Sequence, residues 1–157
     1  MKSIHVKTRE LDHDSAEALL RKHHVGSIAL SFHDRVAISL VNYLYADRSI
    51  YGRMEDGPDI AVLRHDPWVA FEVSEIDGVY DWRVVAVRGS LELLSDKGPA
   101  KKVAEYHAAV DRMRAVVPAV LTPRDPMPQR VQVFRVYVDE MIGRESSSND
   151  DGKLPPA

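Results

Sequence analysis

Short polar connections between long β-rich runs constrain the fold of this chain more than any other feature. Val25–Phe32 is followed after a polar turn at residues 33–34 by the mostly apolar run Val36–Tyr45. A second tight connection at residues 46–48 leads into Ser49–Arg53. Parallel neighbouring strands need a crossover of about a dozen residues or more, so these three runs are predicted to form an antiparallel meander.

Further strand patterns alternate with helix patterns along the rest of the chain. Strands are predicted over Trp68–Ser74, Asp81–Leu94 and Arg130–Ile142, with a bulge or bend at Gly89. Helices are predicted over residues 14–24, 59–65 and 96–117, and the second has Gly57 and Pro58 at its start. The helices look like insertions between six antiparallel strands, which predicts a mainly β or α+β fold with a closed or nearly closed barrel.

Two segments lack a regular pattern. Residues 118–129 hold four of the nine prolines and are expected to form an irregular connection. Residues 146–157 are rich in Ser, Asp and Pro, so we expect a disordered tail after a single domain spanning residues 1–145.

The composition excludes several classes of protein. The chain has 157 residues and a net charge of −3. It contains no cysteine, which excludes disulfides and thiolate chemistry. Its basic residues are dispersed, so nucleic acid is not an expected partner. No apolar run approaches the ~18 residues of a membrane helix, and the N-terminus does not resemble a signal peptide. We therefore expect a soluble, cytoplasmic protein without a membrane partner.

Sequence motifs of common catalytic and metal sites are missing. The seven histidines lie mostly beside charged residues, at helix ends or in turns, without the spacing of metal ligands. The chain contains no GxSxG, Walker or GxGxxG motif. No metal site is predicted, and no catalytic acid, base or nucleophile stands out.

The most informative stretch runs from Val41 to Pro67. Two strands end in a Gly-Arg step at residues 52–53, and an acidic loop then enters a helix. A helix N-terminus presents free amides and a positive dipole, which suit a phosphate group, and Arg53 could add a bidentate contact. The same pattern also fits an ordinary strand–loop–helix connection with a surface arginine.

The order of segments over residues 10–143 resembles the FMN-binding split-barrel family. This is the group of pyridoxamine 5'-phosphate oxidase-like proteins that includes the nitroimidazole-resistance type. The resemblance is carried by LRHDPWVAFEV at residues 63–73 together with WRVVAVRG at residues 82–89. It implies a six-stranded antiparallel split β-barrel with peripheral helices, assembled as a homodimer that binds FMN at the dimer interface.

The resemblance also implies a set of cofactor-binding residues. The strand around Ser39–Tyr43 would pass beside the isoalloxazine ring, the next strand end would lie near the ribityl phosphate, and a later strand would line the site from another side. The implied cofactor-binding residues are Ser39, Val41, Asn42, Tyr43, Arg53, Met54, Gly57, Trp82 and Arg83.

The sequence departs from the family pattern at two places. Pro58 and Asp59 stand where relatives commonly carry basic residues, and Val84 follows Trp82-Arg83 where a serine is common. One function implied is a flavin-dependent oxidoreductase acting on an unknown small molecule. The alternative, favoured by Pro58 and Asp59, is a non-catalytic dimeric binding module with weak or no flavin binding. A third possibility is another cofactor in the same barrel, such as a deazaflavin or haem.

Overall fold

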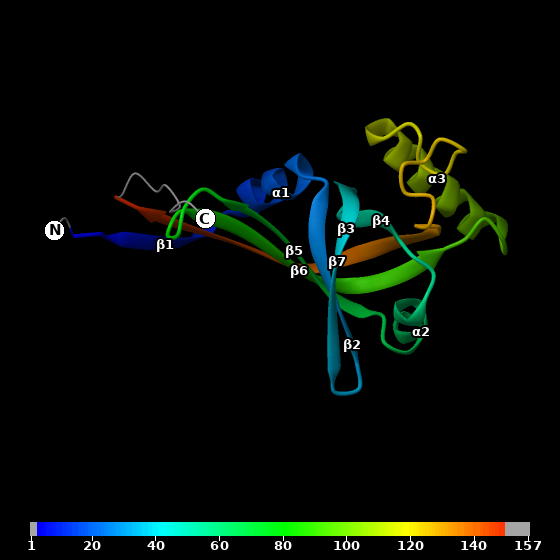
Figure 1. Cartoon of the computed structure of the whole chain (residues 1–157), viewed down its shortest axis with the longest axis horizontal. Helices are drawn as coiled ribbons and strands as arrows, with labels where there is room; N and C mark the ends of the chain where they lie inside the picture. Colours follow the sequence, from blue (N-terminus) through cyan, green and yellow to red (C-terminus); the bar gives the residue numbers. More distant parts are fainter. Residues whose placement is uncertain (1–2, 150–157) are drawn as a thin grey trace.

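The computed structural model describes residues 3–149 as one sheet of seven strands with three helices (Figure 1). In chain order the elements are β1 (Val6–Leu11), α1 (His13–Lys22), β2 (Val25–Phe32), β3 (Arg35–Ala46), β4 (Ser49–Met54), α2 (Pro58–His65), β5 (Trp68–Ile76), β6 (Trp82–Leu94), α3 (Ala100–Val116) and β7 (Gln132–Ser148). All strand pairs are antiparallel.

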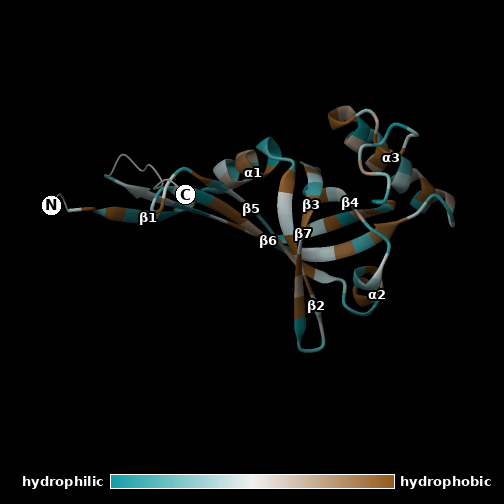
Figure 2. Cartoon of the chain, in the orientation of Figure 1, coloured by the Kyte–Doolittle hydropathy of each residue, from teal (hydrophilic) through white to brown (hydrophobic). Residues whose placement is uncertain are grey.

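Six of the strands close on themselves. The order along the sheet is β7-β4-β3-β2-β5-β6, and β6 pairs again with β7 over thirteen registered positions from Trp82↔Ser146 to Leu94↔Val133. This confirms the predicted fold class, a six-stranded antiparallel split β-barrel with peripheral helices. Apolar and polar bands alternate along the strands (Figure 2), as expected where one face of a strand is buried.

A seventh strand, β1, extends the barrel into an arm that also holds the far end of β7 (Figure 1). The sequence did not indicate this strand, because five of its six residues are exposed and only Leu11 is buried. Helix α1 covers one face of the arm. A Cβ atom at Gly143 would lie 2.9 Å from the Cβ of Ala16, so a glycine is needed for the helix to approach β7 this closely.

Strand β7 continues past the expected domain boundary at residue 145. It runs to Ser148, and Ser146 is buried with its hydroxyl donating to the carbonyl oxygen of Tyr80 at 2.6 Å. The Ser148 amide donates to the Asp81 carboxylate at 2.7 Å. These bonds come from the loop before β6, and pairing with β1 and β6 holds the same segment in place, which its composition alone could not indicate. Residues 150–157 of the predicted tail lie outside the described residues.

The predicted irregularity at Gly89 is confirmed. The register between β6 and β7 shifts between Arg88 and Gly89. A Cβ atom at Gly89 would lie 2.1 Å from the carbonyl oxygen of Tyr137, which no side chain can tolerate. Glycine therefore lets the long β6 bend as it passes from the arm into the barrel.

Side chains of the strands pack into two hydrophobic clusters on opposite faces of the sheet. Tyr43 and Tyr45 point into the larger cluster inside the barrel, whereas Leu44 between them joins Val110 and Met113 under α3. Helix α3 therefore covers the outer surface of the barrel beside β3 and β4. Within residues 3–149, the helices are all too short or too polar to cross a membrane.

Candidate functional site

Strand β3 has a free edge over most of its length. It pairs with β4 only from Tyr43 to Ala46, and Arg53 and Met54 at the end of β4 pair with β7 alone. Among the described residues, no strand pairs with residues 35–42 on that side. An unpaired strand edge presents backbone N–H and C=O groups that can bind another chain or a ligand.

A cleft of about 250 Å³ opens beside this free edge, and we call it the edge cleft. Its apolar walls are Ile28 and Leu30 on β2, Val41 on β3 and Met54 at the end of β4; Ser39, Leu40, Glu55, Asp59 and Arg130 complete the lining. The structure thus brings together three of the predicted residues, Ser39, Val41 and Met54. Gly57 lies nearby in the exposed turn before α2 but is not part of this lining.

The edge cleft has more negative than positive groups. Glu55 follows β4 directly, and Asp59 lies in the first turn of α2, after Pro58 at the helix start. Arg130 is the cation of the lining, and it donates hydrogen bonds to the side-chain oxygen of Asn42 at 3.1 Å and to the carbonyl oxygen of Leu40 at 3.5 Å. Sequence reasoning missed Arg130 as a site residue: it was predicted to begin the last strand, whereas the structure places it just before β7.

Arg53 is buried and already has an acidic partner. Its guanidinium donates to both carboxylate oxygens of Asp125, at 2.6 and 3.2 Å, and to the carbonyl oxygen of Arg130 at 2.9 Å. Burial acts to raise the pKa of the Asp125 carboxyl, but hydrogen bonds from Arg53 and from two backbone amides lower that pKa to about 2. A phosphate in contact with Arg53, as the sequence suggested, would share the guanidinium with the Asp125 carboxylate.

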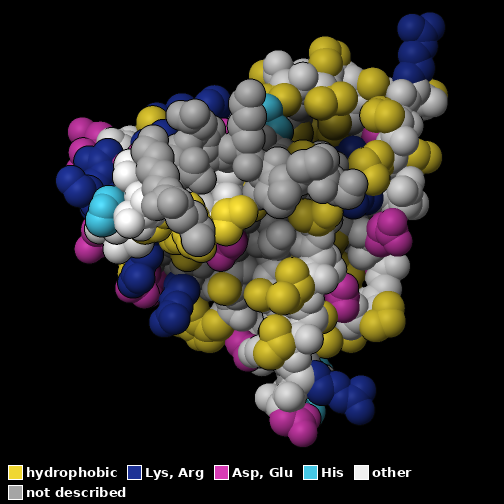
Figure 3. Space-filling view, turned by 60° about the vertical axis from the view of Figure 1, so that its left-hand side comes forward, with side chains coloured by type: hydrophobic (Ala, Val, Ile, Leu, Met, Phe, Trp, Pro, Cys, Tyr) yellow, Lys and Arg dark blue, Asp and Glu magenta, His cyan; other side chains and the backbone are white. Residues whose placement is uncertain are grey.

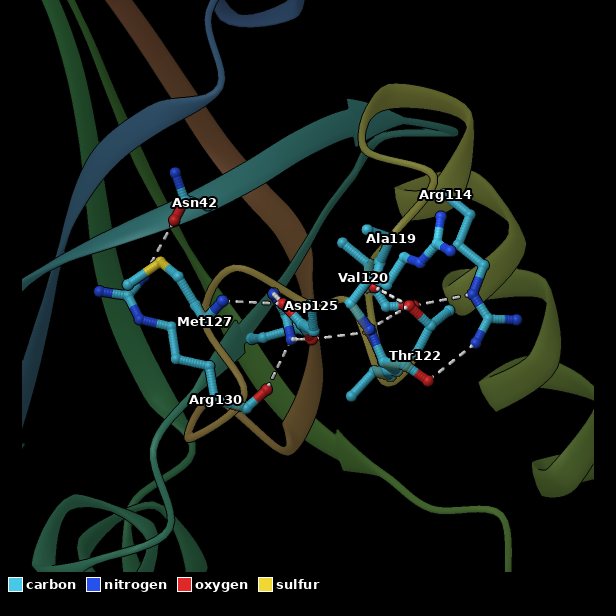
Figure 4. Close-up of polar contacts among 11 residues, drawn as sticks. Asn42, Arg114, Ala119, Val120, Thr122, Asp125, Met127 and Arg130 are labelled. Carbon is cyan, nitrogen blue, oxygen red and sulfur yellow. Dashed lines mark hydrogen bonds and ion pairs between the residues drawn. The ribbon is translucent and has the colours of Figure 1, made fainter.

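Asp125 lies at the centre of the hydrogen bonds in the connection between α3 and β7 (Figure 4). Asp125 also accepts from the amides of Leu121 and Met127, at 2.8 and 2.9 Å. Arg114 on α3 donates to the carbonyl oxygens of Val120 and Leu121. The proline-rich segment is therefore a fixed wall rather than a loose loop.

That wall faces β3 across a second cleft of about 280 Å³, which we call the loop cleft. Asn42, Tyr43 and Arg53, all predicted as cofactor-binding residues, belong to this cleft and not to the edge cleft. The Tyr43 side chain is held in place, since its hydroxyl donates to the carbonyl oxygen of Leu20 at 2.7 Å and its ring packs edge-on against Phe71.

Trp82 and Arg83 lie on the arm, apart from both clefts. Trp82 pairs with Ser146 and Arg83 with Glu145, near the end of β7. Neither residue belongs to the lining of the edge cleft or of the loop cleft. The Nε atom of Arg83 is buried and makes no hydrogen bond within the described part of the chain. Within one chain, the predicted site is thus divided between the barrel and the arm.

The outward face of β3 is apolar and exposed. Val36, Ile38 and Leu40 alternate along the strand, with exposed fractions of 69%, 72% and 65%. They belong to the β2–β3 hairpin, which projects from the barrel (Figure 1), and hydrophobic side chains gather above its charged tip in Figure 3. A row of uncovered apolar side chains beside a cleft is typical of an interaction surface.

The sequence and the fold both match known proteins. The sequence profile described as pyridoxamine 5'-phosphate oxidase matches residues 12–145. No curated protein matches the chain significantly.

Solved structures with this fold include a protein described as FAD-binding from Mesorhizobium loti, with 22% identity, a TM-score of 0.73, and coverage of 89% of this chain and 99% of that one. A protein provisionally described as a 5-nitroimidazole antibiotic resistance protein from Bacteroides thetaiotaomicron has 19% identity and a TM-score of 0.71, covering 96% and 97%. An FAD-binding protein from Mycobacterium smegmatis has 18% identity and a TM-score of 0.61, covering 88% and 97%.

Proposed function

The chain belongs to the pyridoxamine 5'-phosphate oxidase family, and on this basis we propose that it is a flavin-binding oxidoreductase acting on a small molecule, with FMN as the flavin. The observation that carries the proposal is the edge cleft, where Ser39, Val41 and Met54 meet at the unpaired edge of β3. Similar folds in two proteins described as FAD-binding add support for a flavin.

The residues of the edge cleft fit the flavin ring. An isoalloxazine needs flat apolar walls and backbone donors and acceptors for its polar edge. Ile28, Leu30, Val41 and Met54 supply apolar side chains, and the unpaired edge of β3 supplies backbone groups. When bound, a flavin supplies hydride or single-electron transfer, and this chain would hold and desolvate the ring.

The same residues do not fit the phosphate of FMN. A phosphate in the edge cleft would meet the carboxylates of Glu55 and Asp59 with one guanidinium, that of Arg130, to offset them. Pro58 also removes one amide from the start of α2. We therefore expect recognition to come mainly from the ring, with FMN bound no more tightly than riboflavin.

An absorption spectrum and flavin titrations test the proposal. Quenching of the flavin fluorescence should show that riboflavin and FMN each bind saturably to the wild type. Ser39→Trp should fill the edge cleft and abolish the quenching, whereas Ala108→Trp, on the exposed surface of α3, should not. Failure of both flavins to bind the wild type would refute a flavin site in this cleft. Binding to Ser39→Trp with the same affinity as to the wild type would also refute it.

We further propose that two chains form a homodimer that completes the site. Trp82 and Arg83 lie away from the edge cleft of their own chain, so a second chain would have to bring them to the flavin. The exposed apolar face of β3 is a suitable contact surface. Light scattering should give twice the 17.7 kDa of one chain.

Variants can separate this dimer from a monomer. Ile38→Glu, on the exposed face of β3, should yield monomers that bind flavin weakly, and Lys101→Glu, on the exposed surface of α3, should leave the dimer intact. Trp82→Ala should weaken flavin binding while the dimer persists. A wild-type monomer that binds flavin fully would contradict a site shared between two chains.

A non-catalytic binding module is the second candidate. Glu55 and Asp59 in the edge cleft favour it, because they oppose a phosphorylated cofactor. It predicts a colourless purified protein that does not take up FMN or riboflavin. Reduction of bound flavin by an added electron donor, followed by transfer to an acceptor, would instead support the oxidoreductase.

A further inference from the structure

The loop cleft is a second preformed cavity that the proposed flavin site does not use. Its volume is about 280 Å³. Its apolar lining comes from β3, from the end of α3 and from the connection to β7, and includes Leu44, Met113, Val116, Val117, Val120 and Met127. A concave, mostly apolar cavity with a few polar groups is the usual form of a small-molecule site.

The walls of the loop cleft are held by buried polar contacts. The Asp125 carboxylate accepts four hydrogen bonds, two from Arg53 and one each from the amides of Leu121 and Met127. This bonding fixes the wall before any ligand arrives, so little conformational entropy is lost on binding. It also neutralises the guanidinium of Arg53, which leaves no unpaired charge to attract an ionic ligand.

Two polar groups at the cleft offer complementary hydrogen bonds. The Nδ1 atom of His24 lies 3.1 Å from the carbonyl oxygen of Tyr43. Because a carbonyl only accepts, Nδ1 carries a hydrogen, and in this tautomer Nε2 is an acceptor. The side-chain oxygen of Asn42 accepts from Arg130, which leaves the Asn42 amide nitrogen as a donor.

Both side chains line the loop cleft, and these two nitrogen atoms lack other partners among the described residues. His24 immediately precedes β2, whose first residue, Val25, is registered with Asn42 on β3. Within residues 3–149, neither Nε2 of His24 nor the amide nitrogen of Asn42 makes a hydrogen bond. A group that both donates and accepts, such as a primary carboxamide, would satisfy the two side chains together.

We propose that the loop cleft binds a neutral, compact apolar molecule carrying a carboxamide group. The apolar body would lie against Met113, Val117 and Met127, and the carboxamide would face His24 and Asn42. The hydrogen bond between Asn42 and Arg130 separates this cavity from the edge cleft, which Arg130 lines. The proposal does not depend on flavin binding.

The methionines provide an independent signal for each cleft. Met54 lines the edge cleft, Met113 and Met127 line the loop cleft, and Met141 packs against the barrel core. The full-length protein, labelled with ¹³C at the methionine methyl groups, is titrated with 2-naphthamide as the probe. Assignments come from single Met→Leu variants. We expect saturable shifts of the Met113 and Met127 signals, without shifts at Met54 and Met141.

Two variants test the apolar and polar parts separately. Val117 is partly exposed, so Val117→Trp can fill the cleft without repacking the core, and it should weaken binding by roughly tenfold or more. Ala108→Trp, on α3 and outside the cleft, is the matched control. Asn42→Ala should weaken 2-naphthamide binding by about three- to tenfold, and leave binding of 2-methylnaphthalene unchanged.

Several outcomes would overturn the proposal. These are the absence of saturable shifts, equal shifts at all four methionines, or unchanged binding in Val117→Trp. Equal affinity of the wild type for 2-naphthamide and 2-methylnaphthalene would remove the role of His24 and Asn42. A flavin-induced shift of Met54 reports on the proposed oxidoreductase alone, so each proposal can fail without the other.

Discussion

The edge cleft and the loop cleft share strand β3 but differ in charge and in how their walls are held. The edge cleft is bounded by an unpaired strand edge and carries Glu55 and Asp59 against Arg130. The loop cleft is apolar, and its one buried cation, Arg53, is neutralised by Asp125. One strand can line two such different cavities because they lie at different points along it: residues 39–41 lie beside the unpaired edge, and residues 42–44 lie where pairing with β4 begins.

The largest expected effect comes from removing the buried carboxylate that braces the loop cleft. Asp125→Ala would leave the guanidinium of Arg53 buried without its acidic partner, a change that typically costs about 3–5 kcal/mol of stability. The exposed Lys22–Glu75 pair provides the control, and Lys22→Ala should cost less than about 1 kcal/mol. Urea unfolding measures both, and similar losses in the two variants would show that the buried pair does not hold the wall.

The stabilisation from the Arg53–Asp125 pair should also depend on pH. The pKa of Asp125 in the folded protein is about 2, below its ordinary value of 3.8, so the folded state favours the ionised carboxylate. Its contribution to stability is therefore present above about pH 4 and is lost as the pH falls towards 2. Over this pH range, the free energy of unfolding should fall more steeply with decreasing pH for the wild type than for Asp125→Asn. Parallel curves of unfolding free energy against pH would contradict this assignment.

Sequence reasoning found the fold more completely than the site. The short turns around β2, β3 and β4 dictate an antiparallel barrel, and Gly89 marks the bend in β6. Strand β1 was not predicted, because its residues are mostly exposed and the strand is defined by its pairing with β7. Such an edge strand has no local hydrophobic signature.

The site could be predicted only in part because it depends on contacts distant in sequence. The resemblance to the family identified Ser39, Val41 and Met54, which do lie together. The partner of Arg53 is 72 residues away in an irregular connection, so no spacing rule could indicate it. The predicted β3 residues were assigned to one cofactor site. In the structure, Ser39 and Val41 line the edge cleft, whereas Asn42 and Tyr43 line the loop cleft.

Removing the acidic groups should convert the edge cleft into a better phosphate site. The double variant Glu55→Gln with Asp59→Asn relieves repulsion of the FMN phosphate, and we expect about tenfold tighter FMN binding, or about 1.4 kcal/mol. Riboflavin has no phosphate and serves as the matched ligand control, with unchanged affinity. The gain should shrink as salt rises, and an equal gain for riboflavin would show that the phosphate lies elsewhere.

The smallest effects are expected from shortening the C-terminal end of the chain. Deleting residues 150–157 should shift the Tm by less than about 1 °C, since the segment has few apolar side chains to bury. Deleting residues 146–157 also removes the bonds of Ser146 and Ser148 and should lower the Tm by several degrees. Equal Tm values for the two deletions would place the domain boundary at residue 145 after all.

The most direct test of the account is to find which cleft a flavin occupies. Riboflavin is added to the full-length protein labelled with ¹³C at the methionine methyl groups, and the four internal methionines are followed. We predict a saturable ring-current shift of Met54 in the edge cleft, lost in Ser39→Trp, with Met113 and Met127 unmoved. Shifts of Met113 and Met127 with Met54 unchanged would contradict the account, because they would put the flavin in the loop cleft.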